Sequence, residues 1–176
     1  MINDKLIKQF VRTVPDYPVE GINFYDVNSL FSSDYWGIAA ERLARKAESE
    51  FHYPTHIVGI ESRGFVVGSV VAHEMLRSFC MVRKKGSKYP GKLLEESYEL
   101  EYGTDTLTLQ EGILGHTSRV IIADDLVATG GSLMATKKLI EQTGAQVLGA
   151  ITIINLKYLN PKNFDIPMVS LMEINK

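Results

Sequence analysis

The strongest chemical signal in the sequence is the segment 119–132, which reads RVIIADDLVATGGS. An apolar stretch typical of a buried strand ends in two neighbouring carboxylates, Asp124 and Asp125. A loop of small residues then precedes an expected helix. In open α/β sheets, ligands bind beyond the carboxyl ends of the strands, at this kind of strand–loop–helix junction. The segment is therefore the candidate ligand site.

The loop formed by Ala128, Thr129, Gly130, Gly131 and Ser132 has the composition of a phosphate site. Its two glycines let the backbone approach an anion, and the start of the following helix offers unpaired N–H groups. The two acids before the loop would repel that phosphate, so they need another partner. Ionised carboxylates only accept hydrogen bonds, which suits the vicinal hydroxyls of a sugar. Phosphate and diol together describe a ribose 5-phosphate.

The glycine pair belongs to neither of the two common nucleotide-binding motifs. The G-x-x-x-x-G-K-[ST] motif of P-loop proteins and the G-x-G-x-x-G dinucleotide motif are both absent from the chain. A glycine pair after a strand is by itself often only a tight turn. The functional interpretation therefore depends on the acid pair that precedes it.

The elements that must position this segment follow from hydrophobic periodicity. Leu6, Ile7, Phe10 and Val11 have helical spacing, and Asp34 is a candidate N-cap for a helix running to Glu50. Short buried strands are expected at 56–60, 79–82, 119–123 and 147–155, and further helices at 65–77 and 131–142. Repeated strand–loop–helix units predict an α/β fold, with a parallel central sheet and helices on both faces.

Two segments between these units are different. Residues 83–97 are rich in lysine, glutamate, glycine and proline without an apolar period, so we expect a long loop. Residues 98–110 alternate between apolar and polar, as in an antiparallel hairpin or edge strand. Residues 83–92 carry five cations and residues 95–105 carry five acids, so a basic segment adjoins an acidic one.

Composition excludes several classes of protein. The chain has 176 residues, of which 45% are hydrophobic, and a net charge of −2 from 19 basic and 21 acidic side chains. These values indicate a folded domain and argue against a general nucleic-acid binder. The single cysteine, Cys80, cannot form an internal disulfide. No signal peptide or membrane-length apolar run is evident, so we expect a cytoplasmic protein with no membrane partner.

The sequence resembles the adenine phosphoribosyltransferase family, a branch of the type I phosphoribosyltransferases. VIIADDLVATGGS at 120–132 is similar to the motif with which that family binds phosphoribosyl pyrophosphate. The similarity continues in VRTVPDYPVEGINFYD (11–26), GIESRGF (59–65), RKKG (83–86) and YELEYGTD (98–105), in matching order over nearly the whole chain. ESRGF and LEYGTD distinguish this branch from relatives that act on other bases.

The resemblance implies transfer of ribose 5-phosphate from phosphoribosyl pyrophosphate to a ring nitrogen of adenine, releasing AMP and pyrophosphate. It implies a type I phosphoribosyltransferase fold in one domain over 1–176. Within it, a hood segment (1–33) would close over the base, and a flexible flap and hairpin (83–110) would cover the site. The flap can reach a neighbouring subunit in this family, so a homodimer is implied.

The resemblance also implies roles for individual residues. Asp124 and Asp125 would bind the ribose hydroxyls, Arg63 would face the pyrophosphate, and Glu101 would handle the proton of the adenine ring. Leu126 would pack on the base. Further substrate contacts would come from the loop 128–132 and from Asn23, Phe24, Tyr25, Ser62, Gly64, Arg83, Lys84, Lys85, Lys88 and Tyr102.

Mg²⁺ is the expected cofactor, held mainly by pyrophosphate and water, because this ion keeps several waters and favours substrate phosphates. We assign it no protein ligand, since the four histidines show no metal-ligand spacing.

Two segments depart from the family pattern. Tyr25 stands where an arginine is usual, and RKKGSKYPG differs from the usual RKxGKLPG by the extra Ser87 and by Tyr89 in place of leucine. Two alternatives therefore stay open at this point. One is a phosphoribosyltransferase for another purine, hypoxanthine or guanine; the other is a regulator that binds phosphoribosyl pyrophosphate without catalysis.

Overall fold

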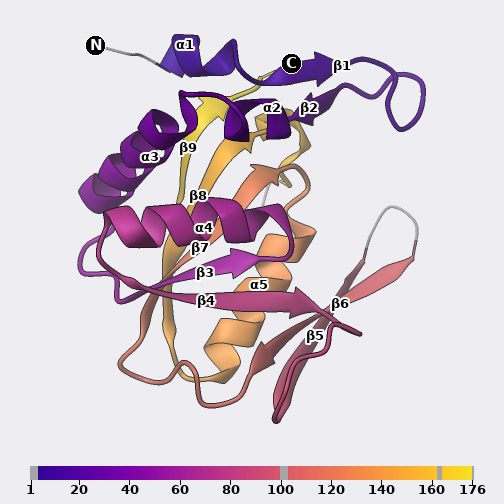
Figure 1. Ribbon diagram of the computed structural model, residues 1–176. Coiled ribbons are helices and arrows are strands. Elements are labelled where there is room, and N and C mark those ends of the chain that lie inside the picture. Colours follow the sequence, from indigo (N-terminus) through magenta and orange to yellow (C-terminus); the bar gives the residue numbers. More distant parts are fainter. Residues whose placement is uncertain (1–3, 100–102, 162–163, 176) are drawn as a thin grey trace.

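The computed structural model describes residues 4–99, 103–161 and 164–175. Its main sheet has seven strands in the order β5-β6-β4-β3-β7-β8-β9, and a second sheet pairs β1 with β2 (Figure 1). The main-sheet strands are β3 (His56–Ile60), β4 (Ser78–Lys84), β5 (Leu93–Glu99), β6 (Thr104–Gln110), β7 (Arg119–Val127), β8 (Gln146–Asn155) and β9 (Met168–Glu173). The remaining elements are α1 (Asp4–Lys8), β1 (Arg12–Val14), β2 (Phe24–Asp26), α2 (Asn28–Phe31), α3 (Trp36–Glu50), α4 (Arg63–Glu74), α5 (Gly131–Gln142) and the 3₁₀ helix η1 (Lys157–Leu159).

The five strands from β4 to β9 in sheet order are parallel, whereas β6 runs antiparallel to β4 and β5 antiparallel to β6. The predicted parallel sheet with an antiparallel hairpin at its edge is therefore confirmed. The carboxyl ends of the parallel strands meet on one side of the molecule, beside the hairpin and below the N-terminal segment (Figure 1).

Helices cover both faces of the sheet, as predicted. In Figure 1, α3 and α4 lie in front of it and α5 lies behind it. Alternate residues of β7 serve the two layers: Ile121 and Ala123 join the core beneath α3 and α4, while Val120 and Ile122 join the core beneath α5. A strand buried on both faces needs an unbroken apolar run, which β7 supplies up to its acid pair.

The N-terminal segment packs over the sheet edge formed by β8 and β9. Ile7, Val27 and Leu30 are fully buried in the core beneath α3 and α4. The Arg12 guanidinium pairs with Asp26 at 2.7 Å across the β1–β2 ladder, and Ser29 Oγ donates to the Phe10 carbonyl at 2.7 Å. The first helix stops at Lys8, short of Val11 where the apolar spacing placed it. Among the described residues, no helix is long and apolar enough to span a bilayer.

The prediction of a loop over 83–97 was wrong at both ends. β4 continues to Lys84, and β5 begins at Leu93 and pairs with β6 from Leu93↔Gln110 to Glu99↔Thr104. Glu96 interrupts the apolar–polar alternation by which β5 could have been recognised in the sequence. The half-buried position 96 is a glutamate instead of an apolar residue, because its carboxylate pairs with Lys138 of α5 at 3.2 Å. Only 85–92 lies between the two strands.

Three further boundaries differ from those expected. Asp34 does not cap α3: the cap position is Tyr35, with φ −93° and ψ −7°, and no side chain caps the helix. Strand β7 runs four residues past Ala123, because β8 continues alongside it through Asp124↔Thr152 and Leu126↔Ile154. Strand β9, which completes the sheet beside β8, was not among the strands expected from the sequence.

Gly149 lies where α3 ends against the sheet. A Cβ at this position would lie within 2.5 Å of the Pro167 carbonyl oxygen and closer still to the Phe51 ring. Replacing Gly149 by alanine should lower the free energy of unfolding by about 2 kcal/mol, because backbone and ring must both shift. Gly115→Ala is the matched control, since nothing lies within 4 Å of a Cβ there. Chemical denaturation of both variants checks this, and equal stabilities would contradict it.

Candidate active site

The acid pair lies where the two neighbours of β7 diverge. Pairing of β3 with β7 ends at Gly59↔Ala123, whereas β8 continues beside both acids. Asp125 is 4% exposed, and its Oδ2 lies 3.0 Å from Nε of Arg63, the first residue of α4. Asp124 Oδ1 accepts a hydrogen bond of 3.0 Å from the Asp125 backbone N–H. Asp125 thus pairs with the guanidinium, and Asp124 beside it is bonded to the backbone.

Burial raises the pKa of both acids. The negative charge of Asp125 raises the pKa of Asp124 further, while Arg63 opposes the rise at both residues. Among the described side chains, Asp125 Oδ2 is buried and makes no hydrogen bond, because its close approach to Arg63 Nε is an ion pair without hydrogen-bond geometry. The pair is therefore short of donors, and hydroxyl groups of a ligand would supply them.

Close packing of α4 on β7 brings Arg63 to this position. A Cβ on Gly64 would lie 2.6 Å from the Ala123 carbonyl oxygen and 3.2 Å from Asp124 Oδ1. Only glycine allows the first turn of the helix to approach the strand so closely. The peptide before it, Glu61–Ser62, is cis. Ser62 and Arg63 are both exposed at the start of α4.

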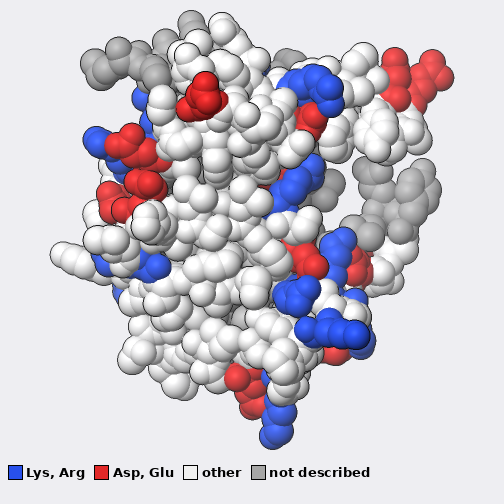
Figure 2. All heavy atoms as spheres, viewed as in Figure 1, with Lys and Arg blue, Asp and Glu red and all other residues white. Residues whose placement is uncertain are grey.

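A cavity of about 710 Å³ opens in front of the acid pair. In Figure 2, basic side chains gather on this side of the molecule, below the N-terminal segment and around the end of β4. Arg63 and Lys84 are the cations among the residues that line the cavity. The complete lining is Ile60, Glu61, Ser62, Arg63, Lys84, Tyr98, Asp124, Asp125, Leu126 and Ser132.

The loop 128–132 borders a second cavity of about 260 Å³, which shares Tyr98, Leu126 and Ser132 with the first. Gly130 is the N-cap of α5 and has φ +78°, a left-handed conformation that glycine adopts without strain. A Cβ on Gly130 would strike the Phe164 ring at 2.5 Å, and one on Gly131 would lie 3.3 Å from the Tyr98 ring. The glycine pair therefore fits between two aromatic rings, at the start of a helix that borders the cavity.

Tyr98 is a site residue that the sequence prediction missed. It lies on β5 between the two cavities, and its hydroxyl donates to Asp105 Oδ2 at 3.4 Å. Burial first, and then the nearby carboxylates Asp105 and Asp124, raise its pKa to about 12, so it stays a donor. The sequence signal that could have identified Tyr98 was its position in the motif YELEYGTD. The two residues predicted from that motif, Glu101 and Tyr102, lie outside the described residues.

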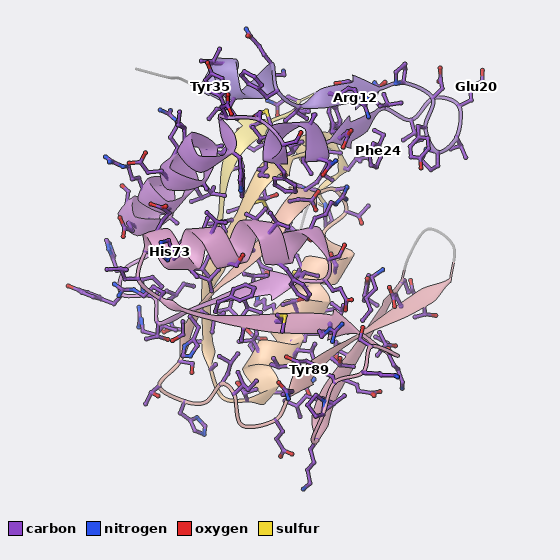
Figure 3. The ribbon with its side chains drawn as sticks, viewed as in Figure 1. Arg12, Glu20, Phe24, Tyr35, His73 and Tyr89 are labelled. Atoms are coloured by element: carbon purple, nitrogen blue, oxygen red, sulfur yellow. The ribbon has the colours of Figure 1, made fainter. Side chains whose placement is uncertain are left out.

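The three predicted hood residues face in two directions. The Arg63 guanidinium lies 5.9 Å from the centre of the Phe24 ring, so Phe24 belongs to the acid-pair side. Figure 3 shows Phe24 on the small sheet, above the ends of the main strands. Asn23 and Tyr25 instead line a separate cavity of about 450 Å³ with Tyr158 and Leu159. Burial, and then the neighbouring Tyr158, raise the pKa of Tyr25.

Comparison with known proteins assigns this arrangement to a family. The model of the phosphoribosyl transferase domain matches residues 27–168. An adenine phosphoribosyltransferase from Rhodospirillum rubrum is 43% identical over 168 residues, covering 94% of this chain and 96% of its own. The crystal structure of the enzyme of that name from Thermoanaerobacter pseudethanolicus superposes with a TM-score of 0.90 at 34% identity, covering 98% of this chain and all of that one.

This chain belongs to the adenine phosphoribosyltransferase family. A Saccharomyces cerevisiae member has a TM-score of 0.89 at 33% identity, with 96% of this chain and 98% of that chain covered. That structure was solved with adenine and D-2,5-dideoxy-2,5-imino-altritol 1,6-bisphosphate. The fold is that of the type I phosphoribosyltransferases.

The four candidate cations of the flap are not equally placed. Lys84 lines the main cavity, and its Nζ lies 3.1 Å from Asp105. Arg83 pairs with Glu61 at 3.4 Å, and Lys85 pairs with Glu95 at 2.7 Å. Lys88 is exposed on the segment 85–92. Of this set the structure brings Lys84 together with the acid pair and Arg63.

The raised pKa values of the acid pair predict a gain in stability for Asp124→Asn. A carboxyl whose pKa is higher folded than unfolded binds its proton more tightly when folded, so stability falls as pH rises above about 4. An amide removes that loss and the repulsion of Asp125. We expect Tm at pH 7 to rise by about 2–4 °C. Thermal melts from pH 3 to pH 8 test this. The two proteins should converge at the acid end, and a variant that is less stable at pH 7 would contradict the prediction.

Proposed function

We propose that this chain transfers the 5-phosphoribosyl group from phosphoribosyl pyrophosphate to adenine, giving AMP and pyrophosphate. The observation that carries the proposal is the acid pair, which meets Arg63 and opens onto the same cavity as Ser132, the last residue of the loop 128–132. A cation, diol acceptors and a helix N-terminus then lie along one path, in the order of the pyrophosphate, the hydroxyls and the 5-phosphate of the sugar substrate. Membership of the family supports the same reaction.

In this reaction the bond from the anomeric carbon to pyrophosphate breaks, and its electron pair leaves with the pyrophosphate oxygen. A ring nitrogen of the base supplies the pair for the new bond to carbon. Negative charge grows on the leaving group while positive charge grows on the sugar. Arg63 opposes the first change and the carboxylates at 124 and 125 suit the second. Such prearranged charges commonly make the largest contribution to catalysis.

We assign the loop 128–132 to the 5-phosphate. Gly130 and Gly131 expose the first N–H groups of α5, which attract an anion together with the helix dipole. Tyr98 lies against Gly131, so its ring would cover the bound phosphate from the hairpin side. We assign adenine to the space between Leu126 and Phe24, because Leu126 borders both cavities and Phe24 lies opposite, over Arg63.

Proton handling and exclusion of water are assigned to the segment 83–110. Glu101 would accept the proton that the base loses on forming its new bond. A sugar cation would also react with water, so a closed site must keep water out. The strands β5 and β6 bring the hairpin to the border of both cavities, which suits that task.

Magnesium fits the site as a companion of the substrate. Among the described residues there is no group of three or more His, Cys, Asp or Glu side chains that could hold a metal ion. The acid pair offers two carboxylates beside an open cavity, and Mg²⁺ favours few carboxylates together with substrate phosphates and water. Asp124 and Asp125 would contact the hydrated ion, which would neutralise charge on the pyrophosphate when bound.

The proposal extends to the assembly and its setting. We infer one catalytic domain over 1–176 and a homodimer, since the family's flap can reach a neighbouring subunit. We place the enzyme in the cytoplasm, because a sugar carrying three phosphate groups has too much charge to cross a membrane unaided.

A panel of bases tests the substrate. The protein is incubated with phosphoribosyl pyrophosphate and Mg²⁺, and with adenine, hypoxanthine or guanine in separate reactions. We expect AMP from adenine, with kcat/KM at least about 100-fold above that of the other bases, because unpaired edge groups of a wrong purine are costly to bury.

Turnover of guanine or hypoxanthine without adenine would show a phosphoribosyltransferase for another purine. Tight binding of the sugar substrate with no nucleotide formed from any base would show a regulator instead. Tyr25→Arg, which restores the usual family residue, is the variant with which to test whether Tyr25 tunes the choice of base.

Glu101→Gln should lower kcat by about 100-fold while changing the KM for adenine little, because the proton moves only in the transition state. Steady-state kinetics in both substrates measure this. Glu111→Gln is the control, since it removes an acid just beyond β6, from a residue that does not line the described cavities. A change confined to the KM for adenine would assign Glu101 to binding.

A further inference from the structure

Glu61 anchors a network that the roles above do not use. Its Oε2 accepts a hydrogen bond from the Lys84 backbone N–H at 2.8 Å and another from Ser87 Oγ at 3.0 Å. Arg83 Nε lies 3.4 Å from the same oxygen. One carboxylate thus binds the end of β4 and the first turn of the segment 85–92.

Tyr89 completes the network from the other side of Arg83. The guanidinium lies 5.5 Å from the centre of the Tyr89 ring, and the Tyr89 hydroxyl donates to the Met81 carbonyl at 3.1 Å. Figure 3 shows Tyr89 beside β4 and β5, away from Phe24 and the hood. Arg83 is therefore held between a carboxylate and an aromatic face.

The other end of the network is the turn that carries Ser62 and Arg63. Glu61 directly precedes these residues, and its backbone N–H donates to the Val82 carbonyl at 2.9 Å. Burial would raise the pKa of Glu61, but the hydrogen bonds from Lys84 and Ser87, together with the charge of Arg83, outweigh burial and lower it. Glu61 is consequently a fixed anion, bonded through both its backbone and its side chain.

We propose that Glu61, Ser87 and Tyr89 form a positioning network that holds the turn 61–63 in its pyrophosphate-binding arrangement. The network contains both departures from the family's flap pattern, the additional Ser87 and the Tyr89 that replaces leucine. These two residues therefore act together: the serine hydroxyl bonds to Glu61, and the tyrosine ring holds Arg83 against the same carboxylate. The inference builds on the proposed function, because it assigns the pyrophosphate end of the substrate to this turn.

Ser87→Ala tests the hydroxyl. Inorganic pyrophosphate with Mg²⁺ is titrated into the wild type and the variant by calorimetry, and KM is measured for both substrates. We expect Kd for pyrophosphate and KM for phosphoribosyl pyrophosphate to rise about 5–10-fold, the effect of a lost hydrogen bond to a charged group. KM for adenine and Tm should not change.

Two controls sharpen this test. Ser87→Thr keeps a hydroxyl and should restore both constants. Ser69→Ala removes an exposed hydroxyl of α4 that bonds to the Val66 carbonyl, outside the network around Glu61, and should leave every value unchanged.

Tyr89→Leu tests the ring. The variant restores the usual family residue and removes both the contact with Arg83 and the bond to Met81. It should raise the same two constants as Ser87→Ala. The double variant should be no worse than about the larger single effect, because residues that act as one unit do not add.

Three results would overturn the proposal. These are an unchanged Kd for pyrophosphate in Ser87→Ala, equal changes in the KM of both substrates with a lower Tm, and fully additive effects in the double variant. Failure of the proposed function is visible separately, as a wild type that binds pyrophosphate but forms no AMP.

Discussion

The site depends on the free-energy cost of placing two adjacent carboxylates near the end of β7, where β3 has stopped pairing and β8 continues. Burial opposes ionisation of both Asp124 and Asp125, and the charge of Asp125 further opposes ionisation of Asp124. The surrounding elements are arranged around that cost: α4 begins close enough to place Arg63 against Asp125, and Gly64 makes the close approach possible. The Asp125 oxygen that faces Arg63 makes no hydrogen bond, so it can still accept one from a sugar diol. A buried polar group without a donor is expensive in a folded protein and is characteristic of a binding site.

Local chemistry in the sequence predicted much of this site. The acids, the glycine pair and Arg63 are close in sequence to the strand ends that carry them, so the rule for parallel sheets brought them together. What the sequence did not reveal depended on partners distant in the chain. β5 was hidden because Glu96 faces Lys138 of α5, and the length of β7 was set by β8. The different directions of Phe24 and Tyr25 are set by the alternation of β2, which no local pattern announced.

The cations of residues 83–92 show the same limit of prediction from the sequence alone. Counting charges placed five of them in 83–92 and treated them as equivalent. In the structure, all three of Arg83, Lys84 and Lys85 pair with an acid, but among the flap cations Lys84 is the one that also lines the main cavity. Composition gives the number of charged side chains, but packing decides which of them can reach a ligand. Tyr98 illustrates the point for a neutral group, since its packing against Gly131 and its place between the two cavities mark it as part of the site.

The hood segment packs against a strand that follows it late in the chain. The hood's helix α1 contacts β9, and Ile7 is buried in the core that also contains Leu171 and Met172 of that strand. During synthesis on the ribosome, the residues that form the hood emerge first but lack their packing partner until β9 has followed. The sheet from β3 to β8 can form earlier. An incomplete nascent chain would therefore form the acid pair and the loop 128–132 before α1 has its packing partner in β9.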